Sequence, residues 1–236
     1  MSRFKWIKGW KGFIGKVLLL FIVLGALGWG ANAYYLANFK VEPEQVLQEA
    51  LQHAGTAQSY RYLVEVQVKV NNQERKLSRI YGEIAGEDLY FYGLIHNQEV
   101  KVYQIGDGTY WWDPITGKWA VTPSDRPFDQ AHFLIEANPL ACFNFVSVEG
   151  ITYLGKEKVA GRKAYLIQCS PTVKHDFMNT WFKDFRYKVW IDTKNKAILK
   201  AQISGLFRDQ PENTVFIKLE FKDYGSDIKI TPPVSR

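Results

Sequence analysis

The chain has 236 residues, of which 47% are hydrophobic and 23% are charged, a composition that excludes disordered and fibrous proteins. Its net charge is +6, but five of the 30 basic residues precede residue 17 and no acidic residue precedes Glu42. Without those five, 25 basic residues stand against 24 acidic ones, so the body of the chain is nearly neutral. This balance argues against a nucleic-acid-binding protein.

A basic tail and an apolar segment begin the chain. Residues 1–16 carry the five basic side chains, and residues 17–36 read VLLLFIVLGALGWGANAYYL, with Asn32 as the only clearly polar residue. An apolar run of about 20 residues suffices for one helical crossing of a bilayer, and flanking positive charge stays in the cytoplasm. We therefore expect a single-pass signal-anchor in the cell membrane, with residues 41–236 as an extracytoplasmic domain.

The alternative is a cleaved signal peptide. The tripeptide ANA at residues 31–33 fits a small-x-small cleavage site, and cleavage near Ala33 would release the protein from the cell. The anchor is favoured because the apolar character continues beyond this site to Leu36. Neither Cys142 nor Cys169 follows the apolar run, so the sequence does not predict a lipidated cysteine.

The body begins with a predicted helix and a predicted meander of strands. Residues 41–54 combine an apolar stripe with Pro43 in a position that suits a first helical turn. From residue 59 to residue 70 polar and apolar side chains alternate, and further alternating segments follow the turn sequences NNQ, GED and HNQ. This pattern predicts a large, twisted and curved antiparallel sheet with short turns.

The segment GDGTYWWDPITGKW, residues 106–119, continues the meander with two aromatic hairpins. A two-residue turn at Asp107 and Gly108 would place Tyr103 opposite Trp112, and a turn over residues 114–117 would place Trp112 opposite Trp119. A sheet with one wet face would not carry tryptophan on both sides, so both faces need a cover or a ligand. One face would then carry Tyr103, Ile105, Tyr110, Trp112, Trp119 and Val121, with Trp111 on the other face.

A second helix is predicted over residues 127–143, for about three turns that end before Pro139. Phe133, Leu134 and Ile135 make it apolar around most of its surface, which is typical of a buried or lid-like helix. Further hairpins follow along the chain. The whole body therefore predicts an α+β fold with about ten or eleven strands and two or three helices.

Catalysis has little support in the sequence. The four histidines form no HxxH or HExxH pattern, and neither G-x-S-x-G nor S-x-x-K occurs, so no catalytic residue, metal site or cofactor is expected. Glu136, on the apolar middle helix, is expected at its exposed edge. Cys142 and Cys169 could form a disulfide outside the cytoplasm or remain two buried free thiols, and the sequence leaves both open.

Three stretches carry a resemblance to a known family. They are the hairpin GDGTYWWDPITGKW, the hairpin YLGKEKVAGRKAYLIQC, and YKVWIDTKNKAILKAQISG followed by VFIKLEFKDYG. In their order, with a helix before them and a helix between them, residues 41–233 resemble the LolA-like superfamily of exported lipid and lipoprotein carriers. The resemblance implies a curved antiparallel half-barrel with helices against its concave side and an apolar cavity for acyl chains. The chain departs from the family by its apparent membrane anchor.

The resemblance implies a membrane-tethered protein that binds a lipid, a lipoprotein acyl chain or another apolar ligand, as a carrier or chaperone. The expected cavity lies between the curved sheet and the middle helix. The expected partners are the lipid, the membrane and an envelope protein, but no nucleic acid. The alternative is a sensory or interaction module of the RseB type that contacts a partner protein at the cell surface. The candidate ligand contacts are Tyr103, Tyr110, Trp112, Trp119, Phe133 and Leu134.

Overall fold

The computed structural model describes residues 25, 28–29, 41–123 and 134–233 of the chain, which falls into two units, Met1–Glu42 and Pro43–Arg236. Of the predicted membrane span, only residues 25, 28 and 29 are described, and all three are helical. Among the described residues, no helix has the length and apolar character needed to cross a membrane. The predicted anchor thus lies almost wholly outside the described residues and stays a prediction.

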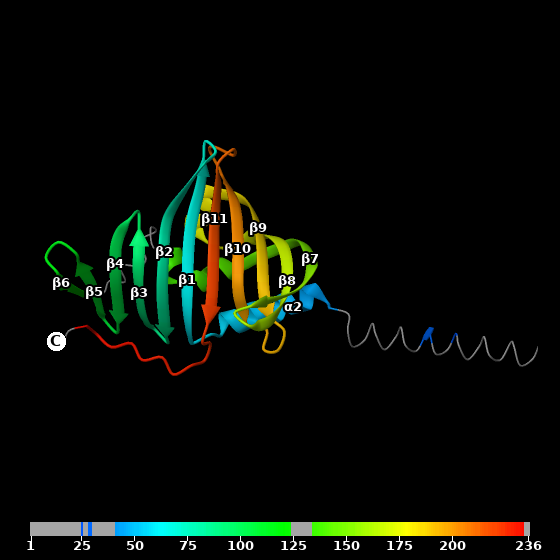
Figure 1. Cartoon of the computed structure of the whole chain (residues 1–236), viewed down its shortest axis with the longest axis horizontal. Coiled ribbons are helices and arrows are strands. Elements are labelled where there is room, and N and C mark those ends of the chain that lie inside the picture. The colour runs from blue at the N-terminus through cyan, green and yellow to red at the C-terminus, as the bar shows by residue number, and fades with distance from the viewer. Residues whose placement is uncertain (1–24, 26–27, 30–40, 124–133, 234–236) are drawn as a thin grey trace, which may run out of the picture. The chain divides into compact units, whose positions relative to one another are not determined.

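The second unit is built on one antiparallel sheet of 11 strands, in the order β6-β5-β4-β3-β2-β1-β11-β10-β9-β8-β7 (Figure 1). The first and last strands pair in the middle of the sheet, and β6 and β7 form its two edges. The predicted large antiparallel sheet is therefore confirmed. The strands are β1 (Ser59–Val70), β2 (Gln73–Ala85), β3 (Asp88–Ile95), β4 (Gln98–Ile105), β5 (Gly108–Asp113), β6 (Lys118–Pro123), β7 (Phe145–Val159), β8 (Arg162–Val173), β9 (Phe182–Asp192), β10 (Ile198–Phe207) and β11 (Thr214–Lys222).

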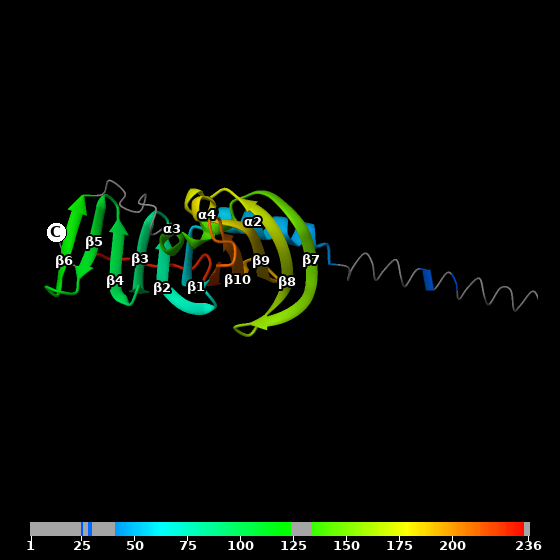
Figure 2. The ribbon, with the colours of Figure 1, turned by 90° about the horizontal axis from the view of Figure 1, so that it is seen from above.

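The few helices lie within the curve of the sheet, as Figure 2 shows. They are α2 (Pro43–Gly55), α3 (Leu134–Ala137), the 3-10 helix η2 (Pro139–Phe143) and α4 (Asp176–Trp181). The predicted first helix is confirmed as α2. Of the predicted middle helix, residues 127–133 lie outside the described residues, and the remainder breaks at Asn138 into α3 and η2. Proline lacks the N–H that a continuing helix needs, so the chain starts a new turn at Pro139.

The core lies on the concave face of the central strands. Alternate residues of β1 are buried, and Val64 pairs with Ile80 of β2 on one side and with Leu219 of β11 on the other. All three of these side chains are fully buried. Each such side chain contributes roughly 1.5–3 kcal/mol relative to an exposed one, so this row of strands stabilises the body.

The register of the aromatic hairpins differs in one respect from the prediction. The first turn is formed by Gly106 and Asp107, so that Tyr103 pairs with Tyr110 and not with Trp112. Gly106 has φ +52°, a left-handed conformation that glycine adopts without a Cβ clash, and this fixes the turn one residue earlier than predicted. The pairing shifts by two residues, so every side chain keeps its predicted face. The predicted pairing of Trp112 with Trp119 is confirmed.

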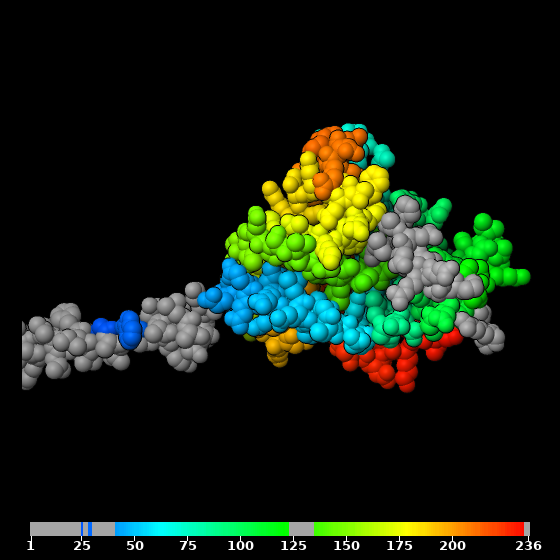
Figure 3. All heavy atoms as spheres, turned by 180° about the vertical axis from the view of Figure 1, so that it is seen from behind, coloured from blue at the N-terminus to red at the C-terminus, as the bar shows by residue number. Residues whose placement is uncertain are grey.

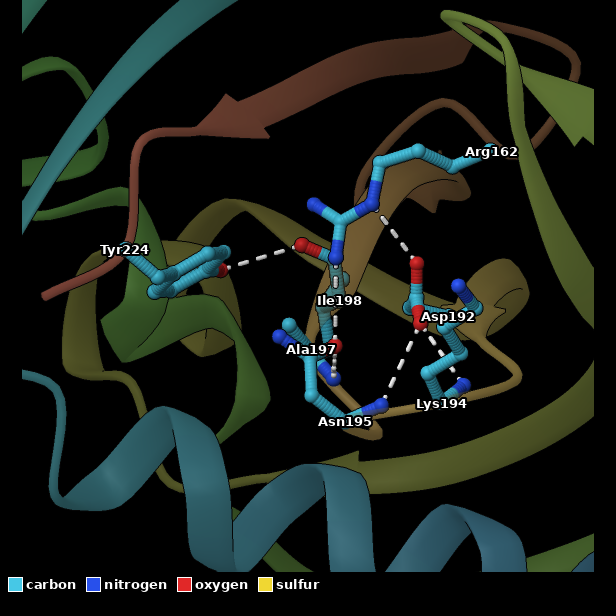
Figure 4. Close-up of polar contacts among 7 residues, drawn as sticks. All are labelled: Arg162, Asp192, Lys194, Asn195, Ala197, Ile198 and Tyr224. Carbon is cyan, nitrogen blue, oxygen red and sulfur yellow. Dashed lines mark hydrogen bonds and ion pairs between the residues drawn. The ribbon is translucent and has the colours of Figure 1, made fainter.

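A buried carboxylate organises the turn between β9 and β10 (Figure 4). Asp192 is 2% exposed and accepts the backbone N–H groups of Lys194 at 2.7 Å and Asn195 at 3.2 Å. Its other oxygen lies 2.7 Å from Nε of Arg162, at the start of β8. This cluster ties two neighbouring turns together, and a structural role accounts for every contact it makes.

The two cysteines are both free and buried. Burial raises the pKa of the Cys142 thiol to about 12 and that of the Cys169 thiol to about 12. Of the two states that the sequence leaves open, the structure has the free thiols, and their high pKa makes them poor nucleophiles.

Candidate functional site

A cavity of about 1070 Å³ opens on the concave side of the sheet. It lies between the C-terminal half of α2, the segment from α3 through η2 into β7, and the ends of β1 to β4 that meet at the β2–β3 and β4–β5 turns. Figure 3 shows the molecule from this side, with α2 in blue. This volume slightly exceeds the range of about 300–1,000 Å³ that small-molecule sites occupy, so the cavity can hold a ligand of considerable size.

The buried residues of the cavity lining form its inner wall and are all apolar or aromatic, although the lining as a whole is about as polar as it is apolar. The lining combines side chains from the helix side with side chains from the concave face of the sheet, so no single segment builds it. Among its apolar residues are Leu51, Tyr60, Ile84, Leu89, Leu140 and Phe143. Such a wall favours an apolar group, because contact with it removes apolar surface from water.

The outer part of the cavity is polar. Its lining includes amide side chains from α2, from the η2 segment and from β4, together with acidic residues of the two sheet turns. These polar residues are Gln48, Gln52, Glu87, Asp88, Gln104, Asp107, Asn138 and Asn144. The cavity lining is therefore mixed, with apolar side chains among its buried residues and polar side chains among its exposed ones.

Buried hydrogen bonds hold the roof of the cavity on the sheet. The Tyr62 hydroxyl donates to the carbonyl oxygen of Glu136 at 2.7 Å, and the Ser78 hydroxyl lies 2.8 Å from the Glu136 carboxylate. On the other side of the roof, the Tyr187 hydroxyl donates to the carbonyl oxygen of Cys142 at 2.9 Å. These three contacts fix α3 and η2 over the concave face, because breaking any of them would leave a buried polar group without a partner.

A glycine makes room for one of these contacts. Gly82 pairs with Tyr62 across the β1–β2 ladder, and a Cβ at this position would overlap the Tyr62 ring. The missing side chain therefore lets the tyrosine ring lie across β2 and reach α3.

Glu136 corrects a prediction. It was expected at an exposed helix edge, but it is 9% exposed and faces the sheet. Burial raises the pKa of its carboxyl, and the hydrogen bond from Ser78 opposes this only in part. Because burial disfavours the charged form, the carboxyl takes up a proton more readily than an exposed glutamate.

The aromatic residues proposed from the sequence lie on the other face of the sheet. The concave face runs from Tyr62 through Gly82, Phe91 and Val102 to Trp111, each paired with the next. Trp111 is thus the tryptophan on the helix side. Tyr110 and Trp112, on either side of Trp111 in the sequence, point to the convex face. So do Tyr103, which pairs with Tyr110, and Trp119, which pairs with Trp112.

On the convex face these four residues do come together. The rings of Tyr103 and Trp119 have centroids 5.4 Å apart, and so do those of Trp112 and Trp119. Tyr103 also stacks on Tyr90 at 4.1 Å, and Tyr110 is buried. The four rings thus lie on the face opposite α3, and their role as ligand contacts stays a prediction.

The two remaining candidates are not placed by the structure. Phe133 lies outside the described residues, and so does the side chain of Leu134, whose backbone begins α3. Within the described parts of the chain, no group of three or more His, Cys, Asp or Glu side chains could hold a metal ion.

The cavity wall contains residues that the sequence prediction did not select. Tyr60 and Leu51 were recognisable as members of an alternating strand and of a helical stripe, but both patterns indicate burial without saying against what. Leu89 and Phe143 come from segments that meet only in the folded chain. The one available signal was the alternation of side chains along the strands: Tyr60 is joined through Ile84 and Leu89 to Gln104, whose side chain points away from that of its neighbour Tyr103.

Solved structures share this architecture. LprF from Mycobacterium bovis aligns with a TM-score of 0.57 at 12% identity, over 82% of this chain and 98% of LprF. The lipoprotein LppX of Mycobacterium tuberculosis aligns with a TM-score of 0.50 at 12% identity, over 81% of this chain and all of LppX (100%). No family model matches the sequence, and no curated protein matches it. At this level of identity the likeness concerns the fold alone: the body of the chain shares its fold with LprF and LppX.

Proposed function

We propose that the body of the chain is an extracytoplasmic binding domain that holds a lipid, an acyl chain or another apolar ligand in the concave cavity. The observation that carries the proposal is the cavity itself, about 1070 Å³ with an apolar inner wall. A concave space of this size, open to solvent at its mouth, is the kind of place at which small molecules bind to proteins. The shared fold supports the proposal, because the resemblance implies a cavity for acyl chains at this place.

Binding and transfer, without catalysis, are the activity that we propose. Among the described residues that line the cavity, no nucleophile is paired with a base, and the buried thiol of Cys142 has a raised pKa. The N-terminal apolar segment would hold the domain at the outer face of the membrane, close to a supply of lipid. N-terminal sequencing of the mature protein tests this: a sequence that starts near Tyr34 would mean cleavage and release.

The ligand can be tested by filling the cavity. Ala57 follows α2 and lines the cavity, whereas the neighbouring Gln58 is exposed and does not. We expect Ala57→Trp to remove the bound lipid with little change in stability, since the indole enters empty space. In a close-packed region the same enlargement would cost about 1–3 kcal/mol.

The matched control is Gln58→Trp, which adds the same side chain one residue away. Lipid extracted from the purified body and its thermal midpoint would be compared for the parent and both variants. Loss of lipid in Ala57→Trp alone supports the proposal. A drop in stability of Ala57→Trp, with no lipid in any of the three proteins, contradicts it.

An interaction module is the second candidate, and the convex face favours it. Tyr81, Tyr92 and Leu94 are 37%, 42% and 48% exposed there, and the two tyrosine rings stack with centroids 5.5 Å apart. Exposed aromatic side chains are enriched at protein interfaces. Replacing Tyr92 by Ser should then abolish the capture of a partner protein from the cell envelope without changing the bound lipid.

A further inference from the structure

The charged residues of the cavity are of one sign. Among the described residues that line it, the charged side chains are Glu87, Asp88 and Asp107, with no lysine or arginine. The rest of the described body mixes both signs, as the ion pairs of Arg61 and Lys218 show. Charges of one sign at the mouth of a cavity set a local electrostatic potential that favours ligands of the opposite charge.

The acidic residues sit where the polar end of a ligand would emerge. Glu87 lies in the β2–β3 turn and Asp107 in the β4–β5 turn, and Asp88 joins the two turns by accepting the Gly106 N–H at 3.2 Å. Glu87 and Asp107 are exposed, and within the described part of the chain neither forms an ion pair. Their charge is thus not neutralised by the fold.

Polar groups beside these acids also lack partners. The amide side chains of Gln48, Gln52 and Gln104 form no hydrogen bond within the described part of the chain. Next to Gln104 across the β4–β5 ladder, the hydroxyl of Thr109 is fully buried and has no hydrogen-bond partner there either. The glutamine amides, of which those of Gln48 and Gln52 are exposed to water, are free to hydrogen-bond a ligand, and the buried Thr109 hydroxyl is the one group here that the described fold leaves unsatisfied.

We propose that the ligand of this cavity is an amphiphile whose head group carries a positive charge. Its chain packs on the apolar wall, its cationic head lies at Glu87 and Asp107, and the amide side chains hydrogen-bond the linkage between them. A carboxylate or phosphate head would face three carboxylates without a counter-charge, so fatty acids and anionic phospholipids are disfavoured. This inference rests on the proposed function and adds the chemical class of the ligand.

The test uses the full chain in liposomes and three photoreactive probes with the same dodecyl chain and different heads: ammonium, maltoside and sulfate. Labelling of peptides from α2 and from η2 is quantified by mass spectrometry. The variant is Glu87→Gln with Asp107→Asn, two substitutions at exposed turn positions. The matched control is Asp209→Asn with Glu212→Gln, which changes the net charge equally in the β10–β11 turn, where both residues are exposed.

We expect the labelling of the variant by the ammonium probe to fall about two- to ten-fold, which is the range that the loss of two exposed carboxylates would produce. Labelling by the maltoside probe should not change. The loss should shrink at high salt, and the control should match the parent. Comparing variant with parent for each probe removes differences in how the probes partition into the membrane.

The outcomes that overturn the inference are distinguishable from those that overturn the proposed function. If maltoside labels the cavity but the variant keeps its ammonium labelling, or sulfate labels the parent as well as ammonium does, the charge of the ligand is wrong and the binding function stands. If no probe labels the cavity, the proposed function fails and the inference fails with it. The mass of a compound extracted from the native protein would separate an amine-bearing lipid from an acylated basic peptide, and an anionic lipid there would contradict the inference.

Discussion

Two regions of the concave face differ in packing: one is a closed core and the other borders a cavity. Over β9, β10 and β11 the face is packed solid, and Tyr187, Ile203 and Ile217 are at most 1% exposed. At the turn end of β1 to β4 the same face borders about 1070 Å³ of cavity. Both regions are made by the same alternation of apolar and polar residues. Periodicity therefore indicates which face is covered, whereas the covering segments decide whether a core or a site results.

The sharpest way to test this difference is to truncate one side chain in each region. Ile217→Ala, in the packed region, should lower the free energy of unfolding by about 2–5 kcal/mol, because a new cavity forms among fixed neighbours. Leu51→Ala, in the half-buried cavity wall, should lower it by less than about 2 kcal/mol, because less apolar surface is lost. Urea denaturation of the body measures both. Equal losses would mean that the cavity wall is as closely packed as the core.

The roof of the cavity should respond to pH through Glu136. Its folded-state pKa is raised by burial, so the folded protein binds a proton that the unfolded chain has already released at the same pH. The carboxyl's contribution to stability is therefore full at pH values below the ordinary glutamate pKa and is lost as pH rises through the raised one. Glu136→Gln keeps a neutral hydrogen-bonding group at this place.

Relative to the parent, Glu136→Gln should gain stability as the pH rises above the ordinary glutamate range. Thermal midpoints across a pH series for both proteins measure this difference. If the two midpoints run parallel over the whole series, then Glu136 titrates as an exposed residue does, and the described packing of α3 on the sheet is wrong.

A smaller effect on stability should show that the aromatic residues of the convex face act independently of the cavity. Tyr103→Ala removes the stacking on Tyr90 and the contact with Trp119, and aromatic pairs contribute about 0.5–1.5 kcal/mol each beyond their buried area. We expect stability to fall while the bound lipid stays, because the cavity is on the opposite face. Loss of lipid in a folded Tyr103→Ala variant would favour the ligand contacts predicted from the sequence.

Much of the fold could be predicted because its signals are local. Alternation over residues 59–70 defined β1, and the side-chain parity of Trp111 and Trp112 held even though the first turn lay at Gly106 and not one residue later. A two-residue error in register leaves the faces unchanged, whereas a one-residue error would have exchanged them. The local pattern therefore determined the two faces of the sheet correctly.

The candidate site could not be predicted to the same extent, because it depends on contacts between distant segments. Parity separates Trp111 from Tyr103 but does not say which of them faces the helices. The partner that buries Glu136 is Ser78, 58 residues earlier in the chain, and no local pattern joins the two. The cavity wall likewise combines Leu51, Leu89 and Phe143 from segments that only the tertiary fold brings together.

The central claim is that the concave cavity holds an apolar ligand, and native mass spectrometry of the purified body tests it most directly. We expect the parent and Gln58→Trp to carry one extra mass of lipid size per chain, which gentle activation releases, and Ala57→Trp to have the mass of the bare chain. Bare mass for all three proteins, when purified from cells with an intact envelope, would contradict the claim. An extra mass that persists unchanged in a folded Ala57→Trp variant would place the ligand elsewhere.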